Sequence, residues 1–538
     1  YHLEITETEM TITAGSDAAV FYAALTIRQL VAPAIAGKYQ LNCCVIDDEP
    51  DFQHRGFFLD VARHFQTVDA IKSLLRLMAS YKLNRLQLGI SNDEGWRLEI
   101  PGIPELTDIG ARRSFHAVDA HGKPRALYPA WGDGHGEDHQ FLTMADFESL
   151  LAYAAVLGIQ IIVELNLPGH ANALIRAMTA SGRYSIVDAL DQSRHQSAQG
   201  YRNNVVNPCL PDVYRLAEQI LIQIKQAYDA VGVALTHVHF GGDETPQGAW
   251  LGSPACEQSN AWDPAWQSGN GLDAVSATAA LMRLHFDQIT AVADKVVPGI
   301  LTGFWHEMSP FANPNNTTAF FNGWVTETGD TQIIHDILAR NQTLVVSNAS
   351  FLYFDMPYGL HVEEPGLPWA AYIDTELIYD FDPLACWEIP PDSFNKVLGL
   401  QAQLWTETID SSDQLAYHVA PRILALAERA WNKKPDSQTW PDFAAALGAR
   451  EFEFLQDLGI KPRIPPPGAI IKEGKLHANV IFPGLSIRYT TDGSNPTGTS
   501  NLYLIPVEVT GSIEVKLATF VDTDPHQRAS RIVVIKPA

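Results

Sequence analysis

The chain has 538 residues, of which 46% are hydrophobic and 18% are charged, and its formal net charge at pH 7 is −25. This length predicts two or three folded domains, and the composition is typical of a globular protein and excludes a largely disordered chain. The negative charge argues against nucleic acid or an anionic membrane as a partner. No run of about 18 apolar residues occurs in the sequence, so we expect no membrane-spanning segment.

Residues 1–50 are expected to form a small α+β domain. Leu3–Ile5 and Met10–Ile12 alternate as strands do, and Ala18–Leu30 has helical spacing. Because so short a segment cannot enclose a large core, we expect it to pack on the domain that follows.

Residues 51–462 alternate apolar runs with helical stretches, which is the pattern of a TIM (β/α)8 barrel. The predicted strands are Gly56–Leu59, Arg85–Leu88, Gln160–Glu164, Thr236–Phe240, Gly299–Gly303, Thr318–Asn322, Thr343–Ser347 and Leu398–Leu404. The predicted helices between them include Val68–Tyr81, Met144–Leu157, Val213–Val231 and Ala274–Val296. Eight β–α repeats over ~400 residues fit such a barrel with insertions, and residues 99–142 form one of these insertions.

Residues 463–538 are expected to form a small antiparallel β-sandwich. The Pro-rich segment Ile464–Gly468 separates them from the barrel. Short alternating runs follow, for example Ile487–Thr490 and Val507–Thr510, and turn sequences such as Asp492–Ser494 divide them.

The most informative motif is His239-Phe-Gly-Gly-Asp-Glu244, at the end of a predicted barrel strand. The paired glycines allow a tight turn, which puts Asp243 and Glu244 at the end of the barrel where catalytic residues lie. Enzymes that hydrolyse glycosides typically use two carboxylate residues. Taken alone, the same pair is more often an acidic turn before a helix, so the rest of the chain must decide.

Every predicted strand is followed by polar or aromatic residues. In chain order these are Asp60 and Arg63, Asn92, Asp93 and Trp96, His170, Asp243 and Glu244, Trp305, Trp324, Tyr353 and Asp355, and Trp405 and Glu407. Aromatic walls with carboxylates and one arginine are typical of a sugar pocket. A single Trp or His is more often structural, and Arg63 could simply pair with Asp60. The joint pattern at eight strand ends is much harder to explain as packing.

The five cysteines contain no C-x-x-C motif, and no histidines cluster at zinc spacing, so we expect neither a metal site nor a cofactor. Cys209 and Cys256 both lie beside prolines in loop-like sequence. A disulfide between them in an oxidising compartment and two free, packed thiols are about equally compatible with the sequence.

The sequence resembles glycoside hydrolase family 20, the β-N-acetylhexosaminidases, and within it the bacterial chitobiase-like branch. The matching segments are Arg55–Phe65, Gly95–Ile100, Pro168–His170, His239–Glu244, Trp305–Glu307, Tyr353–Asp355, Leu404–Glu407 and Ala427–Trp431. The resemblance extends to both ends of the chain. Residues 488–494 look like the chitobiase C-terminal β-sandwich, and the first 50 residues look like the family's small N-terminal domain. The additional N-terminal carbohydrate-binding-like domain of chitobiases has no counterpart here.

The resemblance implies that the substrate's own 2-acetamido oxygen is the nucleophile. It implies that Glu244 is the general acid and base, that Asp243 holds the acetamido N–H, and that Tyr353 donates to the acetamido carbonyl. The remaining roles concern the sugar: Trp305, Trp324 and Trp405 would wall the acetamido pocket and the sugar face, Arg63 and Glu407 would bind O3 and O4, and Asp355 would bind the O4 or O6 side. We also expect the neighbouring Asp243 to raise the pKa of Glu244.

One position departs from the family pattern. The family usually has two aspartates shortly before Gly-Trp-Arg, whereas this chain has Asn92 and Asp93. The resemblance places Asn92 where an aspartate pairs with His170, which in turn supports the general acid, and Asn92 is counted among the substrate-binding candidates. Because an amide cannot stabilise an imidazolium, we expect a less basic His170, unless Asp93 takes over the pairing.

The function implied is that of an exo-acting, retaining β-N-acetylhexosaminidase that removes terminal GlcNAc or GalNAc from chito-oligosaccharides or glycan ends. Two alternatives stay open: the same scaffold acting on another substrate, as a lacto-N-biosidase or on sulfated GlcNAc, and a catalytically silent glycan-binding protein. The expected partner is an oligosaccharide ending in N-acetylhexosamine, with a homodimer left open. We expect a periplasmic, cell-surface or secreted location in a bacterium, with a signal sequence not present in residues 1–538.

Overall fold

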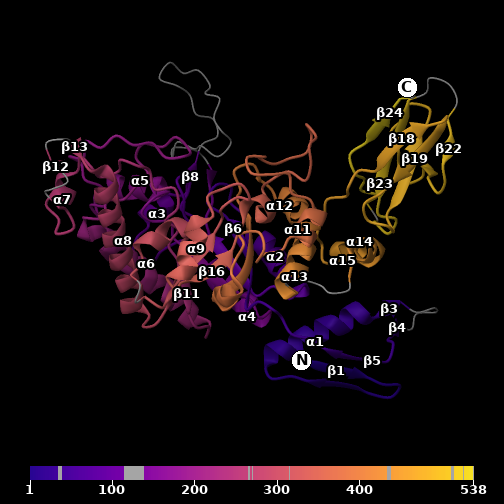
Figure 1. The fold of residues 1–538 in the computed structure, drawn as a ribbon, viewed down its shortest axis with the longest axis horizontal. Coiled ribbons are helices and arrows are strands. Elements are labelled where there is room, and N and C mark those ends of the chain that lie inside the picture. The colour runs from indigo at the N-terminus through magenta and orange to yellow at the C-terminus, as the bar shows by residue number, and fades with distance from the viewer. Residues whose placement is uncertain are drawn as a thin grey trace. The chain divides into compact units, whose positions relative to one another are not determined.

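The computed structural model describes residues 1–33, 39–113, 138–263, 267–268, 271–313, 316–432, 438–509, 514–524 and 526–536 (Figure 1). The chain divides into two compact units. The first comprises Tyr1–Asp374, Phe381–Asp410 and Leu426–Lys433, and the second comprises Thr375–Asp380, Ser411–Ala425 and Lys434–Ala538.

A closed barrel of parallel strands forms the centre of the first unit. Its strands are β6 (His54–Asp60), β7 (Arg85–Gly89), β10 (Gln160–Glu164), β11 (His237–His239), β14 (Leu301–Trp305), β15 (Ala319–Gly323), β16 (Thr343–Val346) and β17 (Val397–Leu404). They pair in sequence order, and β17 closes the barrel against β6. The predicted TIM barrel is confirmed, and each predicted strand overlaps one of these eight.

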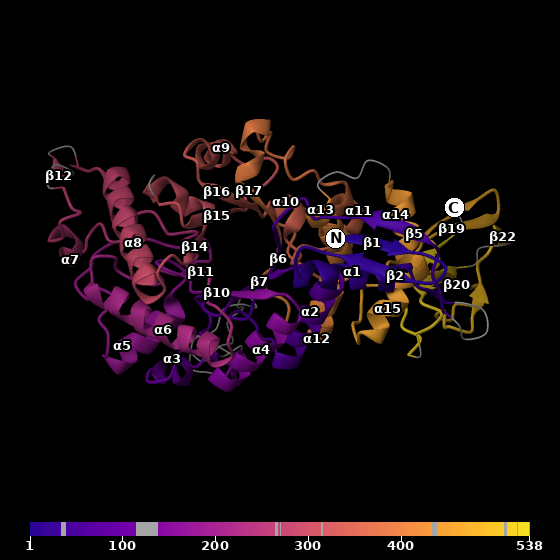
Figure 2. The same cartoon turned by 90° about the horizontal axis from the view of Figure 1, so that it is seen from below.

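Nearly all residues of these strands are buried, because helices cover the outer face of the barrel. The longest are α2 (Val68–Ser80), α4 (Met144–Val156), α6 (Pro211–Ala230) and α8 (Ala274–Val296), and successive ones pack side by side (Figure 2). Helix α2 is capped by Thr67, whose hydroxyl accepts the N–H of Ala70, and it buries Ile71, Leu74 and Met78. None of the helices in the described ranges has both the length and the apolar character that crossing a membrane requires.

Shorter elements connect the barrel strands of the first unit. They are α3 (Glu105–Asp108), α5 (Asn172–Ser181), α7 (Pro254–Glu257), α9 (Gln332–Ala339), α10 (Ala349–Leu352), and the 3-10 helices η3 (His306–Phe311) and η4 (Pro391–Lys396). Within the predicted insertion at 99–142, α3 is followed by the paired strands β8 (Arg112–Arg113) and β9 (Asp138–His139), and residues 114–137 lie outside the described residues.

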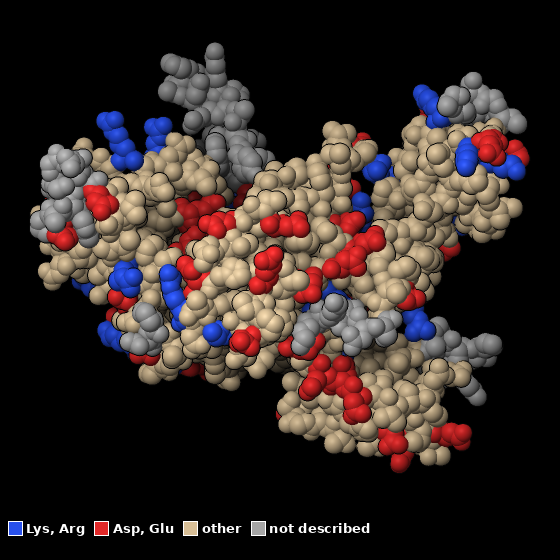
Figure 3. Space-filling view, viewed as in Figure 1, with Lys and Arg blue, Asp and Glu red and all other residues tan. Residues whose placement is uncertain are grey.

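The predicted N-terminal α+β domain is confirmed. It consists of an antiparallel sheet in the order β2 (Met10–Thr13), β1 (His2–Ile5), β5 (Cys44–Asp47), together with helix α1 (Asp17–Leu30). Asp48 connects this domain to the barrel, because its carboxylate accepts the indole N–H of Trp431 at 2.7 Å and lies 3.3 Å from the ammonium of Lys82. Acidic side chains are spread over the face shown in Figure 3, as the net charge of −25 requires.

The predicted C-terminal β-sandwich is also confirmed, in the second unit. One antiparallel sheet has the order β18 (Gly468–Lys472), β19 (Lys475–Asn479), β22 (Val507–Glu508), and the other has the order β21 (Asn501–Leu502), β20 (Ser486–Thr490), β23 (Val515–Phe520), β24 (Val533–Ile535). Its core contains Leu476, Ile487, Val509, Val515 and Leu517.

Cys209 and Cys256 lie next to each other in the first unit. Both are free thiols, which is one of the two possibilities that the sequence left open. The Cys256 thiol donates to Oδ1 of Asn207 at 3.2 Å, so it ties α7 to the chain that leads into α6.

The chain turns sharply after β11. Gly241 and Gly242 have φ values of 67° and 90°. A Cβ atom on Gly241 would overlap the side chain of Asn166, and one on Gly242 would overlap Met308. Glycine is therefore required here both for its backbone conformation and for the close approach of neighbouring side chains. The turn directs Asp243 and Glu244 to the open end of the barrel.

We expect Gly241→Ala to lower the thermal midpoint by several degrees. The positive φ alone costs an alanine ~1–2 kcal/mol, and the overlap with Asn166 adds to it. Gly232→Ala is the matched control, because Gly232 has a φ of 70° but a Cβ atom added there would have no neighbouring heavy atom within 4 Å. Equal midpoint shifts for the two variants, measured by calorimetry, would contradict the close packing around Gly241.

Candidate active site

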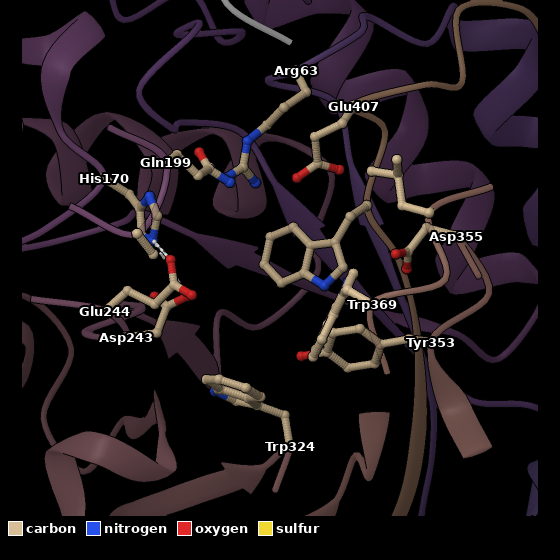
Figure 4. Close-up of a pocket in the computed structure, with 13 residues that line it drawn as sticks. Arg63, His170, Gln199, Asp243, Glu244, Trp324, Tyr353, Asp355, Trp369 and Glu407 are labelled. Atoms are coloured by element: carbon tan, nitrogen blue, oxygen red, sulfur yellow. Dashed lines mark hydrogen bonds and ion pairs between the residues drawn. The ribbon is translucent and has the colours of Figure 1, made fainter. Parts of the chain in front are cut away.

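A cavity of about 320 Å³ opens at the C-terminal end of the barrel strands (Figure 4). Its lining residues are Arg63, His170, Ala198, Gln199, Asp243, Glu244, Trp324, Tyr353, Asp355, Leu367, Trp369, Trp405 and Glu407. Nine of the eleven residues predicted from the sequence are in this set, and Trp305 and Asn92 are the two that are not. The volume is at the lower end of the range of ligand pockets, ~300–1,000 Å³, which suits one sugar residue better than an extended chain.

His170 connects the two acids of the turn to a third carboxylate. Its Nδ1 lies 3.0 Å from Oδ2 of Asp93, and its Nε2 lies 3.4 Å from Oε2 of Glu244 and 3.7 Å from Oδ2 of Asp243. Burial lowers the pKa of His170, but the surrounding carboxylates outweigh burial and raise its pKa well above the ordinary value. The imidazole is therefore held as a cation among the three acids.

The expectation that Asn92 pairs with His170 is wrong. The Asn92 side chain accepts the backbone N–H of Asp93 at 2.8 Å, so it supports its own turn and leaves Asp93 facing the imidazole. Asp93 is itself fixed by the backbone N–H of Asn172 and the side-chain amide of Asn204, both at 3.1 Å. His170 keeps a carboxylate partner, because Asp93 takes over the pairing as the sequence left open, and the less basic imidazole that an amide partner would give does not follow.

The two acids of the turn have opposite pKa shifts. Burial raises the pKa of Glu244, but the hydrogen bond and charge of His170 outweigh burial, and the pKa lies below its ordinary value. Burial raises the pKa of Asp243 to about 6 despite the charge of His170, and the charge of Glu244 adds to the rise. The expected raised pKa of Glu244 is thus wrong for the ligand-free site, because His170 lies directly against that carboxylate.

Arg63 lies on the opposite side of the cavity from Asp243 and Trp324 (Figure 4). Its Nε donates to Glu94 at 2.9 Å, its Nη1 lies 3.4 Å from Asp60, and its guanidinium lies 5.1 Å from the ring centre of Trp405. The pairing with Asp60 suggested by the sequence thus occurs, yet Arg63 still lines the cavity.

Glu407 lies beside Arg63 in the same wall. Burial raises its pKa to about 7, although the charge of Arg63 opposes the rise. A carboxyl group that takes up its proton near neutral pH can donate a hydrogen bond to a sugar hydroxyl or accept one from it.

Trp305 does not reach the cavity. It is the last residue of β14, because that strand continues two residues beyond its predicted end, and its side chain is fully buried. Its ring centre lies 5.7 Å from that of Trp405, so Trp305 supports Trp405 from behind. Trp324, Tyr353 and Trp405 form the aromatic walls that face the cavity.

The catalytic-domain model of glycosyl hydrolase family 20 matches residues 52–434. The chain belongs to glycoside hydrolase family 20. Residues 1–49 match domain 2 of the same family, and residues 451–532 match the chitobiase/β-hexosaminidase C-terminal domain.

Relatives of this family-20 chain include proteins of two Vibrio species. It is 31% identical to the N,N'-diacetylchitobiase of Vibrio harveyi over 95% of this chain and 67% of that protein, and 29% identical to a β-hexosaminidase of Vibrio vulnificus over 92% and 64%. The crystal structure of the exo β-N-acetylglucosaminidase from Vibrio harveyi in complex with N-acetylglucosamine superposes with a TM-score of 0.71 and 30% identity, over 86% of this chain and 67% of that one. The chain therefore spans about two thirds of the length of these relatives.

Four residues of the family-20 cavity were missed by the sequence predictions. They are Ala198, Gln199, Leu367 and Trp369. All four lie in irregular connections, where no periodicity indicates the direction of a side chain. Trp369 had the one usable signal, a tryptophan in a Pro- and Gly-rich stretch shortly after Tyr353 and Asp355. It packs edge-on against Tyr353, with 5.7 Å between ring centres.

We expect Asp93→Asn to lower the pKa of His170, because the imidazolium loses the carboxylate that lies 3.0 Å away. Asp229→Asn, the same change at an exposed residue that pairs with Lys225, should leave that pKa unchanged, which makes it the matched control. NMR titration of the His170 ring measures both.

The raised pKa of His170 also predicts how stability depends on pH. A folded-state pKa above the unfolded value of ~6.5 stabilises the protein fully below that pH, and this contribution is lost as the pH rises through the folded pKa. The stability difference between wild type and Asp93→Asn should therefore be largest below about pH 6.5 and shrink at alkaline pH. An unshifted His170 titration in Asp93→Asn would exclude Asp93 as its partner.

Proposed function

We propose that this protein is an exo-acting, retaining β-N-acetylhexosaminidase that releases terminal GlcNAc or GalNAc from chito-oligosaccharides or glycan ends. The observation that carries the proposal is the adjacent pair Asp243 and Glu244, held by His170 at one side of a cavity of about 320 Å³. Names of relatives at about 30% identity, a diacetylchitobiase and β-hexosaminidases, support the same activity.

In the proposed first step, the acetamido carbonyl oxygen of the substrate attacks C1 while Glu244 protonates the leaving glycosidic oxygen. The C1–O bond to the leaving group breaks, and a bicyclic oxazolinium ion forms. Asp243 accepts the acetamido N–H and stabilises the positive charge that develops there, and Tyr353 donates to the carbonyl oxygen. In the second step, Glu244 takes a proton from the water that attacks C1, which opens the ring and retains the configuration.

The pKa shifts of the two acids favour the opposite distribution of protons, since the pKa is lowered at Glu244 and raised to about 6 at Asp243. Substrate binding favours the arrangement that the reaction needs. The Glu244 side chain is 32% exposed, so a sugar that covers it removes water and raises its pKa. The acetamido N–H, donated to Asp243, stabilises the ionised form of that carboxylate.

The opposite wall is proposed to bind the non-reducing end of the sugar. Arg63 and Glu407 would bind O3 and O4, Asp355 would bind the O4 or O6 side, and Trp405 would cover the apolar face of the ring. A cavity of about 320 Å³ supports an exo-acting enzyme rather than one that releases disaccharides. Arg63 is the single Lys or Arg among the described lining residues and already contacts Asp60 and Glu94, which weighs against a sulfated sugar.

We expect Glu244→Gln to lower kcat on p-nitrophenyl β-GlcNAc by ~10²–10⁴-fold, because the leaving group loses its proton donor. Asp243→Asn should cost ~10²–10³-fold through loss of charge stabilisation. Both variants should keep the thermal midpoint of wild type within a few degrees. Wild type that releases p-nitrophenol from neither the β-GlcNAc nor the β-GalNAc glycoside would overturn the proposed activity.

The 2-acetamido group can be tested as the nucleophile separately. The matching β-glucoside, which carries a hydroxyl at C2, should be cleaved at least ~10³-fold more slowly than the β-GlcNAc substrate, because no group on the protein replaces the missing nucleophile. Tyr353→Phe should slow the β-GlcNAc substrate and leave the residual β-glucoside rate unchanged. Comparable rates of wild type on the two glycosides would instead indicate a nucleophile supplied by the protein.

A further inference from the structure

Trp324 forms the wall on the side of the cavity where Asp243 and Tyr353 lie, and Arg63 and Glu407 lie on the other side (Figure 4). Trp324 follows the end of β15 directly, so it is not held by the barrel ladder. Its indole N–H donates to Oε2 of Glu307 at 3.2 Å. Glu307 does not line the cavity, so it contacts this wall from behind.

A second contact holds the same indole. His306 precedes Glu307 at the start of η3, and its ring packs edge-on against Trp324 with 5.2 Å between ring centres. The Nδ1 of His306 lies 3.1 Å from Oε2 of Glu307. Two consecutive residues thus fix Trp324, one through packing and one through a hydrogen bond, and they lie close to each other as well.

The surroundings of Glu307 disfavour an ionised carboxylate at this position. The titratable groups near Glu307 are Asp243 and Glu244 from the turn after β11, Tyr353 after α10, and His306. His306 is neutral, because burial lowers its pKa to about 3. Among the described residues no lysine or arginine forms an ion pair with Glu307. Burial and the charges of Asp243 and Glu244 raise its pKa well above the ordinary value, so the group favours its protonated form. A protonated carboxyl can still accept the indole N–H of Trp324.

Resting on the proposed function, we propose that Glu307 is a positioning residue that anchors Trp324 and thereby limits the size of the N-acyl group that the site accepts. The acetamido methyl of the substrate has to fit between Trp324, Asp243 and Tyr353. An anchored indole makes this a rigid slot for an acetyl group, whereas an unanchored indole can rotate about its side-chain torsions and admit a longer acyl chain.

Glu307→Ala removes the anchor and provides the test. We expect kcat/KM on p-nitrophenyl β-GlcNAc to fall by ~10–100-fold, the usual cost of a displaced positioning group, and the value on the N-propionyl analogue to fall much less. The preference for N-acetyl over N-propionyl should therefore collapse. Glu307→Gln is the matched control, because its amide oxygen can still accept the indole N–H, and it should keep the acyl preference of wild type.

The coupling to Trp324 can be measured in a double-mutant cycle. Trp324→Phe removes the indole N–H, so adding Glu307→Ala to it should change the acyl preference no further. If Glu307→Ala does not fold, Glu307→Leu tests the same point, since leucine also lacks an acceptor. If wild type is active and has the same acyl preference as Glu307→Ala, the proposed anchoring role of Glu307 is wrong and the proposed function stands. Additive effects of Glu307→Ala and Trp324→Phe lead to the same conclusion. A wild type inactive on every N-acyl glycoside overturns the proposed function instead.

Discussion

The candidate site depends on one cation, the imidazolium of His170. It is buried 3.0 Å from Asp93, 3.4 Å from Glu244 and 3.7 Å from Asp243, and these carboxylates come from the ends of two different barrel strands. Without a positive charge between them, three acids at this distance would repel one another and take up protons. With it, each acid acquires a distinct environment. Asp93 lies against Nδ1 of the imidazole, and the two acids of the turn differ in their affinity for a proton.

The barrel makes this arrangement possible because it brings residues far apart in the sequence to one end. Asp93 follows β7, His170 follows β10, and the Asp243–Glu244 pair follows β11, and these three strands are direct neighbours. The glycines after β11 let the backbone approach Asn166 closely, and the resulting turn places Asp243 and Glu244 at the cavity. A rigid ring of strands with short, specific connections can therefore fix charges whose mutual repulsion would otherwise open the site.

Much of the fold could be predicted from the sequence, because apolar runs of strand length alternate with helical periods over the whole barrel. The site was predicted where a residue directly follows a strand, as Trp324 follows β15 and Trp405 follows β17. It was mispredicted where a single residue decides the direction of a side chain. Asn92 and Asp93 are adjacent, and only the hydrogen bond from the Asp93 backbone to the Asn92 side chain determines which of them faces His170.

Other features had a weak sequence signal or none. Trp305 was misplaced because β14 continues two residues beyond its predicted end, so Trp305 is a paired residue of the barrel and not part of the connection that follows it. Gln199 and Trp369 lie in irregular connections. The lowered pKa of Glu244 follows from a three-dimensional contact with His170, not from its neighbour Asp243 in the sequence. The boundaries after residues 50 and 462 stay predictions.

Trp369 has a further consequence. It is 54% exposed at the rim of the cavity, and its ring lies edge-on to both Trp324 and Tyr353. A sugar that enters the cavity must displace water from these indoles, which moves them to a less polar environment. The intrinsic tryptophan fluorescence of the protein should therefore change when a sugar occupies the cavity. Binding can then be measured without a label and without turnover.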